Sequence, residues 1–207
     1  MTTLASRSER SARREPREAP EAPVGRTTGW WGMVLFICTE GATFAAFIAS
    51  YFYLRFSHDT PWPPLGDRRP SLLVPTVATA VLVLSCVPML LAGRTGRRPF
   101  VHGLLLLVTF LAGAAFVVLQ VVDYTGEWPE STLHKDAYGS LFYTITGLHA
   151  IHVGIGLGML LLLLVGAVVR GVGRGHLGSV RVVALYWYFL SVLALAVYAT
   201  VYLSPYL

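Results

Sequence analysis

The sequence has little charge. Only 13% of its 207 residues are Asp, Glu, Lys or Arg, and 55% are hydrophobic, whereas a soluble domain carries about 25% charged residues. Together with a mean hydropathy of +0.60, this composition excludes an ordinary soluble domain and predicts a membrane protein. The net charge of +5 does not indicate a nucleic-acid partner, because nearly all charged residues lie in tails and loops between apolar runs.

Cysteine is also scarce. The two cysteines, Cys38 and Cys86, both lie inside apolar runs and show no C-x-x-C spacing. This pattern excludes a disulfide framework and a cysteine-rich metal site. We expect both to be small buried side chains.

The N-terminal segment lacks the apolar core of a signal peptide. Residues 1–29 contain six arginines, four glutamates and several prolines and alanines. Such a segment buries too little apolar surface to order itself. We therefore predict a disordered basic cytoplasmic tail over residues 1–29 and a membrane domain over residues 30–207. A tail that rests on anionic lipid is the alternative.

Long apolar runs are what the sequence has in abundance. Five runs are long enough for the roughly 20 helical residues that cross a bilayer, and none alternates as the strands of a barrel do. Backbone groups in lipid must pair within their own segment, so helices are expected. The sequence thus predicts an all-α membrane protein, a bundle of five transmembrane helices. The predicted spans are Trp30–Leu54, Leu72–Ala92, Val101–Val122, Leu141–Val169 and Val182–Leu203.

The second span and the loops carry a few further signals. Pro75 and Pro88 lie near the two ends of the second span, where loss of a backbone donor matters less, so we expect one continuous helix. A turn over residues 93–99 then leads to the third span. The predicted outer loop over residues 123–136 is acidic, with Asp123, Glu127, Glu130 and Asp136.

Lysine and arginine are distributed unequally between the two ends of the spans. Twelve of the sixteen lie in the tail and in the loops after spans two and four, and four lie at the opposite face. The positive-inside rule therefore predicts a cytoplasmic N-terminus and an outer C-terminus. We expect a multi-pass protein in a cell membrane of bacterial or archaeal type.

Only one formally charged residue, Glu40, lies well inside a predicted span. It follows Trp30 by ten residues, which is about 15 Å of helix in hydrocarbon about 30 Å thick. A carboxylate at that depth is unfavourable by roughly 3 kcal/mol. We therefore expect an acid that is protonated, hydrogen-bonded or next to trapped water. A purely structural bond between helices and a proton-related role are both open at this stage.

The fourth span carries two histidines, His149 and His152. Their i, i+3 spacing places them on one helix face, at nearly the same predicted depth as Glu40. We hypothesise that Glu40 and one of these histidines share a buried hydrogen bond. Two histidines without a cysteine or a second acid make a poor metal site, so we expect neither metal ligation nor a catalytic residue in this chain.

Glycines on the same helix are candidates for helix packing. Gly147 lies beside the histidines, and Gly154 and Gly158 are four residues apart, a spacing that lets neighbouring helices approach closely. Gly154→Leu is therefore expected to be more damaging than a change at Glu40. The remaining histidines are expected to be solvated rather than functional: His58, His102, His134 and His176.

Motifs in order along the chain resemble the cytochrome c oxidase subunit III family. In that family a W-G-M-x-L-F motif precedes a mid-helix glutamate, here Glu40, and a T-G-F-H-G-L-H-V motif carries the positions of His149 and His152. The resemblance covers residues 30–203 and is to the shorter five-helix form of the family. The matching stretches are residues 31–45, 119–124, 136–142, 146–153 and 186–189.

The resemblance implies an accessory subunit that binds neither haem nor copper. Haem and copper are then expected in the partners, oxidase subunits I and II, beside which this chain packs. The family also holds membrane phospholipid in a cleft between its helix bundles, and it supports proton uptake and durability under turnover. The resemblance gives Glu40, His149 and His152 a structural or electrostatic role.

Other functions stay open. Tyr188 stands where the family favours His, and Ser191 stands where many members have Asp. These departures leave room for a quinol oxidase or for a subunit III-like accessory protein of nitric oxide reductase. A small proton-coupled transporter with Glu40 as the coupling acid is a further alternative, which the absence of an internal repeat and of mid-span helix breaks disfavours.

Overall fold

A computed structural model of the chain describes residues 28–57, 62, 71–96, 98–127 and 137–206. By length and composition, five helices in this part are able to cross a membrane, which confirms the predicted all-α membrane fold. The predicted tail lies outside the described residues, apart from Thr28 and Gly29 at the start of the first helix, and so do His58 and His134. The elements are α2 (Thr28–Ser57), α3 (Leu73–Leu84), α4 (Cys86–Ala92), α5 (Pro99–Glu127), α6 (Ala137–Arg170) and α7 (Arg174–Tyr198), which continues through a π turn, η1 (Ala199–Leu203), and a 3₁₀ turn, η2 (Ser204–Tyr206).

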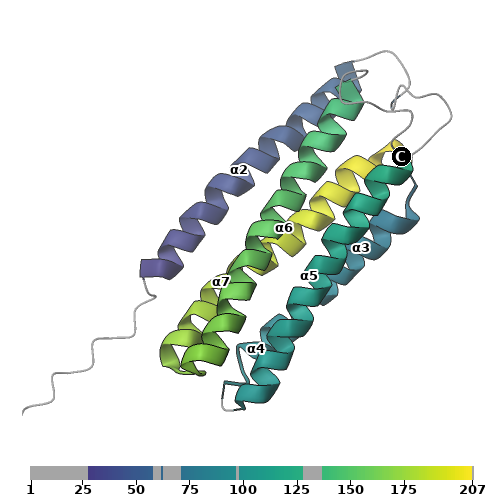
Figure 1. Cartoon of the computed structure of the whole chain (residues 1–207). Coiled ribbons are helices and arrows are strands. Elements are labelled where there is room, and N and C mark those ends of the chain that lie inside the picture. The colour runs from purple at the N-terminus through teal and green to yellow at the C-terminus, as the bar shows by residue number, and fades with distance from the viewer. Residues whose placement is uncertain (1–27, 58–61, 63–70, 97, 128–136, 207) are drawn as a thin grey trace, which may run out of the picture.

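The helices form a bundle with one helix set to the side (Figure 1). α3 and α5 pack against each other, α5 also packs on α6, and α7 contacts both α3 and α6. α2 lies along α6 and α7. We refer to the group formed by α3 to α7 as the inner bundle, and to the contact of α2 with α6 and α7 as the α2 seam.

α2 buries very little of its own surface. Only Phe44 and Tyr51 are buried on this helix, and large apolar side chains such as Leu35 and Phe56 are exposed. The prediction of two buried cysteines is wrong for Cys38, which is exposed on α2, whereas Cys86 is half-buried. Because α2 contacts its neighbours along one narrow face, an apolar run does not by itself imply burial inside the chain.

The second span forms one 20-residue helix, Leu73–Ala92, as the sequence predicts, but this helix is not regular throughout. It is divided at Ser85 into α3 and α4, because Pro88 has no N–H to donate to the carbonyl four residues before it. Side chains from α7 bond to this region. The indole Nε1 of Trp187 donates to Ser85 Oγ at 2.8 Å. Cys86 Sγ donates to Ser191 Oγ at 3.1 Å, while Ser191 donates to the Trp187 carbonyl of its own helix at 3.0 Å.

Close packing in the inner bundle is built around Trp187. A Cβ atom placed on Gly113 or Gly156 would lie 2.5 Å and 2.9 Å, respectively, from the indole ring, so these glycines let α5 and α6 approach α7. Gly154 and Gly158, the predicted packing glycines, face open space, with no atom of the described chain within 4 Å of such a Cβ atom. The i, i+4 pattern therefore does not mark a contact between helices of this chain.

Candidate functional site

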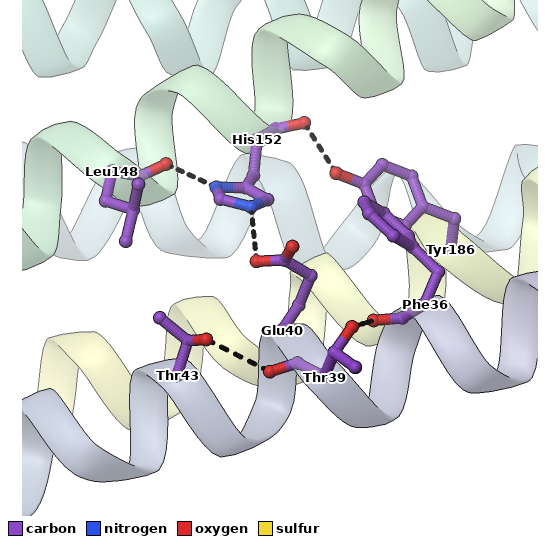
Figure 2. A network of polar contacts seen from close by, with 7 residues as sticks. All are labelled: Phe36, Thr39, Glu40, Thr43, Leu148, His152 and Tyr186. Atoms are coloured by element: carbon purple, nitrogen blue, oxygen red, sulfur yellow. Dashed lines mark hydrogen bonds and ion pairs between the residues drawn. The ribbon is translucent and has the colours of Figure 1, made fainter.

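A hydrogen bond inside the predicted membrane region links α2 to α6. Figure 2 shows the Glu40 side chain reaching from α2 to the His152 imidazole on α6, with 2.8 Å between Glu40 Oε2 and His152 Nε2. Both side chains are largely covered, with 22% and 8% of their surface exposed. The prediction that Glu40 bonds one of the two histidines is confirmed, and the partner is His152.

The second ring nitrogen of His152 determines where the protons lie. Nδ1 is 2.7 Å from the Leu148 carbonyl oxygen, which only accepts, so Nδ1 carries a hydrogen. Nε2 therefore either accepts a hydrogen bond from a protonated Glu40 carboxyl group or, when it carries a hydrogen itself, donates one to the Glu40 carboxylate. In both states one proton lies between the two side chains, and the pair has no net charge, which suits a site away from water.

Neighbouring groups contact both the backbone and the ring of His152. The Tyr186 hydroxyl on α7 donates to the His152 carbonyl at 3.2 Å. The Phe44 ring lies edge-on to the imidazole, with 5.4 Å between the ring centroids. Thr39 and Thr43 beside Glu40 donate to carbonyls of their own helix, so they do not compete for the carboxyl group (Figure 2). The site thus combines residues of α2, α6 and α7.

His149 does not join this site. It is 2% exposed, and neither ring nitrogen has a hydrogen-bond partner. Its ring is edge-on to Phe116 of α5, at 5.5 Å between centroids. Three residues along a helix correspond to a rotation of about 60° between side chains. The two histidines therefore do not point in the same direction, contrary to the prediction from their spacing. His152 lies at the α2 seam, and His149 points toward the inner bundle.

The predicted packing glycine Gly147 lies near this region. A Cβ atom there would be 3.7 Å from the Tyr124 hydroxyl of α5, an ordinary contact. That hydroxyl donates to Thr146 Oγ1 at 2.7 Å, and Thr146 in turn donates to the Phe142 carbonyl at 2.6 Å. The α5–α6 contact is therefore partly polar at this depth.

Sequence reasoning missed a buried acid at the end of α5. Asp123, which the prediction places in the acidic outer loop, belongs to α5 and is 5% exposed. Tyr202 donates to its Oδ2 at 2.6 Å, and Gln120 Nε2 donates to the Tyr202 hydroxyl at 3.3 Å. Tyr202 lies in the π turn over Ala199–Leu203. Such a turn alters the direction in which side chains point around the helix axis. The sequence gives no sign of that turn.

Two histidines expected to be solvated also bond each other. His102 is fully buried, and its Nδ1 lies 2.9 Å from the Ala92 carbonyl, to which it donates. Its Nε2 lies 3.0 Å from Nε2 of His176 on α7. The expectation of solvation is wrong for His102, because α4 folds back over the start of α5. Within the described residues, no group of three His, Cys, Asp or Glu side chains is placed to hold a metal ion.

Comparison with known proteins supplies the context of these sites. The family model described as cytochrome c oxidase subunit III matches residues 23–206. Cytochrome c oxidase subunit 3 of Drosophila yakuba is 33% identical over 182 residues, which cover 83% of this chain and 68% of that protein. The protein of the same name from Lumbricus terrestris is 33% identical over 186 residues, covering 85% and 70%, respectively. The one from Gallus gallus is 31% identical over 182 residues, covering 83% and 68%.

Proposed function

Because the chain belongs to the cytochrome c oxidase subunit III family, we propose that it is a cofactor-free accessory subunit of a haem–copper terminal oxidase in aerobic respiration. It stabilises the catalytic subunit and supports proton uptake, while the haem and copper chemistry takes place in partner subunits I and II. The observation that carries this proposal is the family match over nearly the whole chain, which includes the bonded pair Glu40 and His152.

The Glu40–His152 bond has two roles in this proposal. It holds α2 against the inner bundle, because α2 buries few side chains of its own. It also keeps one exchangeable proton inside the membrane without net charge. His149 contributes to the electrostatics of the same region from the neighbouring face of α6. These roles are structural and electrostatic, and the chain itself transfers no electrons.

The placement in the membrane follows from charge and exposure. The arginine-rich tail and the loops after α4 and α6 face the cytoplasm, and the C-terminus lies outside, as the unequal Lys and Arg counts favour. The exposed apolar surface of α2 and the exposed glycines of α6 are available for subunit I and for membrane phospholipid. The asymmetry of charge favours an orientation and not a kind of membrane, and the relatives compared above come from animals, so the expected bacterial or archaeal type is not supported.

Purification from the native membrane tests the assignment. A tagged chain is extracted in mild detergent, and the optical spectrum of the preparation is recorded together with the identity of the copurifying proteins. We expect a haem spectrum and subunits I and II. A chain that purifies alone and without haem contradicts the proposal, and solute flux by that chain in liposomes supports the transporter alternative.

The activity of the purified complex separates the oxidase from the nitric oxide reductase alternative. We expect oxygen consumption with reduced cytochrome c or quinol and no reduction of nitric oxide. The same complex prepared from a strain that lacks this chain serves as the control. If the chain supports proton uptake and durability, the control complex begins turnover and then loses activity faster than the complete complex.

A further inference from the structure

A small cavity lies beside the unpartnered ring of His149. It is bounded by Thr79 on α3, Phe116 and Gln120 on α5, and Tyr202 in η1, together with three residues of α7: Ala194, Val197 and Tyr198. Its volume is about 10 Å³, close to the smallest space that accommodates one water molecule. The cavity is therefore too small for an organic ligand, and it lies where α3, α5, α6, α7 and η1 meet.

The groups around this cavity leave hydrogen-bonding capacity unused. A neutral imidazole has one donor and one acceptor, and neither nitrogen of His149 has a protein partner. A charged ring is unfavourable here, because the side chain is buried against the apolar Phe116. Leaving both nitrogens without any partner in the interior is also unfavourable. A small polar ligand that bonds at least one ring nitrogen is therefore favourable here.

Gln120 connects the cavity to the buried acid. Its Nε2 donates to Tyr202, whose hydroxyl donates to Asp123 Oδ2. The amide oxygen of Gln120 is then its accepting group. A donor in the cavity that bonds this oxygen extends the series of hydrogen bonds from the end of α5 toward the middle of α6.

We propose that one ordered water molecule occupies the cavity and bonds His149 and Gln120. It completes a chain of hydrogen bonds from Asp123 through Tyr202 and Gln120 to His149. Water fits because one molecule can donate to the Gln120 amide oxygen and at the same time bond one ring nitrogen of His149. An apolar gas of the same size would leave both imidazole nitrogens unpaired. This hydration site is independent of the oxidase assignment.

The chain of hydrogen bonds ends at His149. Phe44 has edge contacts with both histidines, at 6.4 Å to the His149 ring and 5.4 Å to the His152 ring. Its apolar ring thus lies next to both and offers no hydrogen-bonding group between them. The water site joins α5, α6 and η1 to one another and stays separate from the Glu40–His152 pair.

A high-resolution map of the complete chain in its membrane complex tests the proposal directly. The expected result is a density peak within about 2.6–3.2 Å of a His149 ring nitrogen and of the Gln120 amide oxygen. An empty cavity, in a map that resolves ordered water at other buried positions, would overturn the proposal. So would a His149 ring that bonds a protein group directly.

A double-mutant cycle tests the same site without a map. His149→Leu and Gln120→Leu are made singly and together in the complete chain, and the rate of thermal inactivation is measured for each. With the bridging water, each single change speeds inactivation. The double variant should then inactivate roughly threefold or more slowly than expected from multiplying the two single rate increases.

The sign of the single effect gives a second criterion. Without water, His149→Leu removes two unsatisfied nitrogens from the interior and should slow inactivation, which would overturn the proposal.

A control cycle uses Thr109→Val in place of Gln120→Leu. Thr109 is also buried on α5, and its hydroxyl donates to the Leu105 carbonyl of its own helix. The effects of His149→Leu and Thr109→Val should multiply independently. Equal coupling in both cycles would also count against the bridge.

Discussion

The α2 seam and the inner bundle use neighbouring histidines of the same helix in different ways. His152 meets Glu40 through a direct bond of 2.8 Å, where α2 has few other buried contacts. His149, three residues earlier, faces α5 and α7 beside a small cavity and has no direct protein partner. The seam therefore depends on two specific polar bonds, this one and the bond of the Tyr51 hydroxyl with Ser204 Oγ in η2 at 3.0 Å, whereas the inner bundle depends mainly on the close fit of apolar side chains and glycines.

The largest expected effect lies in the inner bundle. A Cβ atom on residue 156 would lie 2.9 Å from Trp187 Cζ3 and 3.1 Å from Leu190 Cδ1. The side chain introduced by Gly156→Leu therefore collides with both residues. Trp187 must then move away from Ser85, and we expect a loss of about 3 kcal/mol of stability. Thermal unfolding in detergent measures this loss. Gly103→Leu on α5, where a Cβ atom meets nothing within 4 Å, is the matched control, and equal losses at both sites would contradict the description of the bundle.

A change at the seam is expected to have an intermediate effect. Glu40→Leu removes the partner of His152 Nε2 and leaves that nitrogen unpaired, with a loss of about 2 kcal/mol and weaker attachment of α2. Glu40→Gln keeps a hydrogen-bond donor at the same position and should retain most of the stability. Thermal unfolding and hydrogen exchange along α2 provide the measurements. Equal stability of the Leu and Gln variants would show that the bond contributes little to the seam.

A neutral hydrogen bond of the inner bundle gives a smaller expected effect. Tyr124→Phe removes the donation from Tyr124 to Thr146 Oγ1, at 2.7 Å, while Thr146 keeps its bond to the Phe142 carbonyl. We expect a loss of about 1 kcal/mol, less than that of Glu40→Leu. Tyr53→Phe is the control, because Tyr53 is 71% exposed on α2. A loss for Tyr124→Phe larger than that for Glu40→Leu would reverse the comparison between seam and bundle.

The depth of residues in the membrane could be predicted, whereas their rotation about the helix axis could not. Counting residues along two antiparallel helices placed Glu40 and the histidine pair at one level, and the Glu40–His152 bond confirms it. Which histidine faces α2 depends on how α6 is rotated between α2, α5 and α7. That rotation is set by side-chain packing between helices, so apolar runs of nearly uniform composition carry little information about it.

Local departures from regular helix were also hidden from the sequence. Asp123 seemed to be a loop residue because it follows an apolar run, yet α5 continues past it to Glu127. Its partner Tyr202 lies in a π turn. The irregularity at Ser85 lies beside Pro88, and Trp187 and Ser191 of α7 bond Ser85 and Cys86 there. Each feature depends on contacts between distant segments of the chain.

The smallest expected effect belongs to Gly154, which the sequence pattern ranked first. A Cβ atom there meets no atom of the described chain within 4 Å, and its neighbours Ile151 and Ile155 are 62% and 44% exposed. Gly154→Leu should therefore change the stability of the chain by no more than about 0.5 kcal/mol. Thermal unfolding of the chain without partners measures this effect, and a loss near that of Gly156→Leu would contradict the placement of Gly154.

The same variant locates the partner-facing side of α6. If Gly154 and Gly158 lie against another subunit, Gly154→Leu should lower the amount of partner that copurifies while the chain itself stays folded. Val168→Ala, on the same helix and also exposed at 86%, controls for a general effect of changes at the exposed surface. Because small residues allow helices to approach closely in a membrane, selective loss of the partner would assign the exposed glycines to the interface between subunits. Retention of the full amount of partner would assign this face of α6 to lipid.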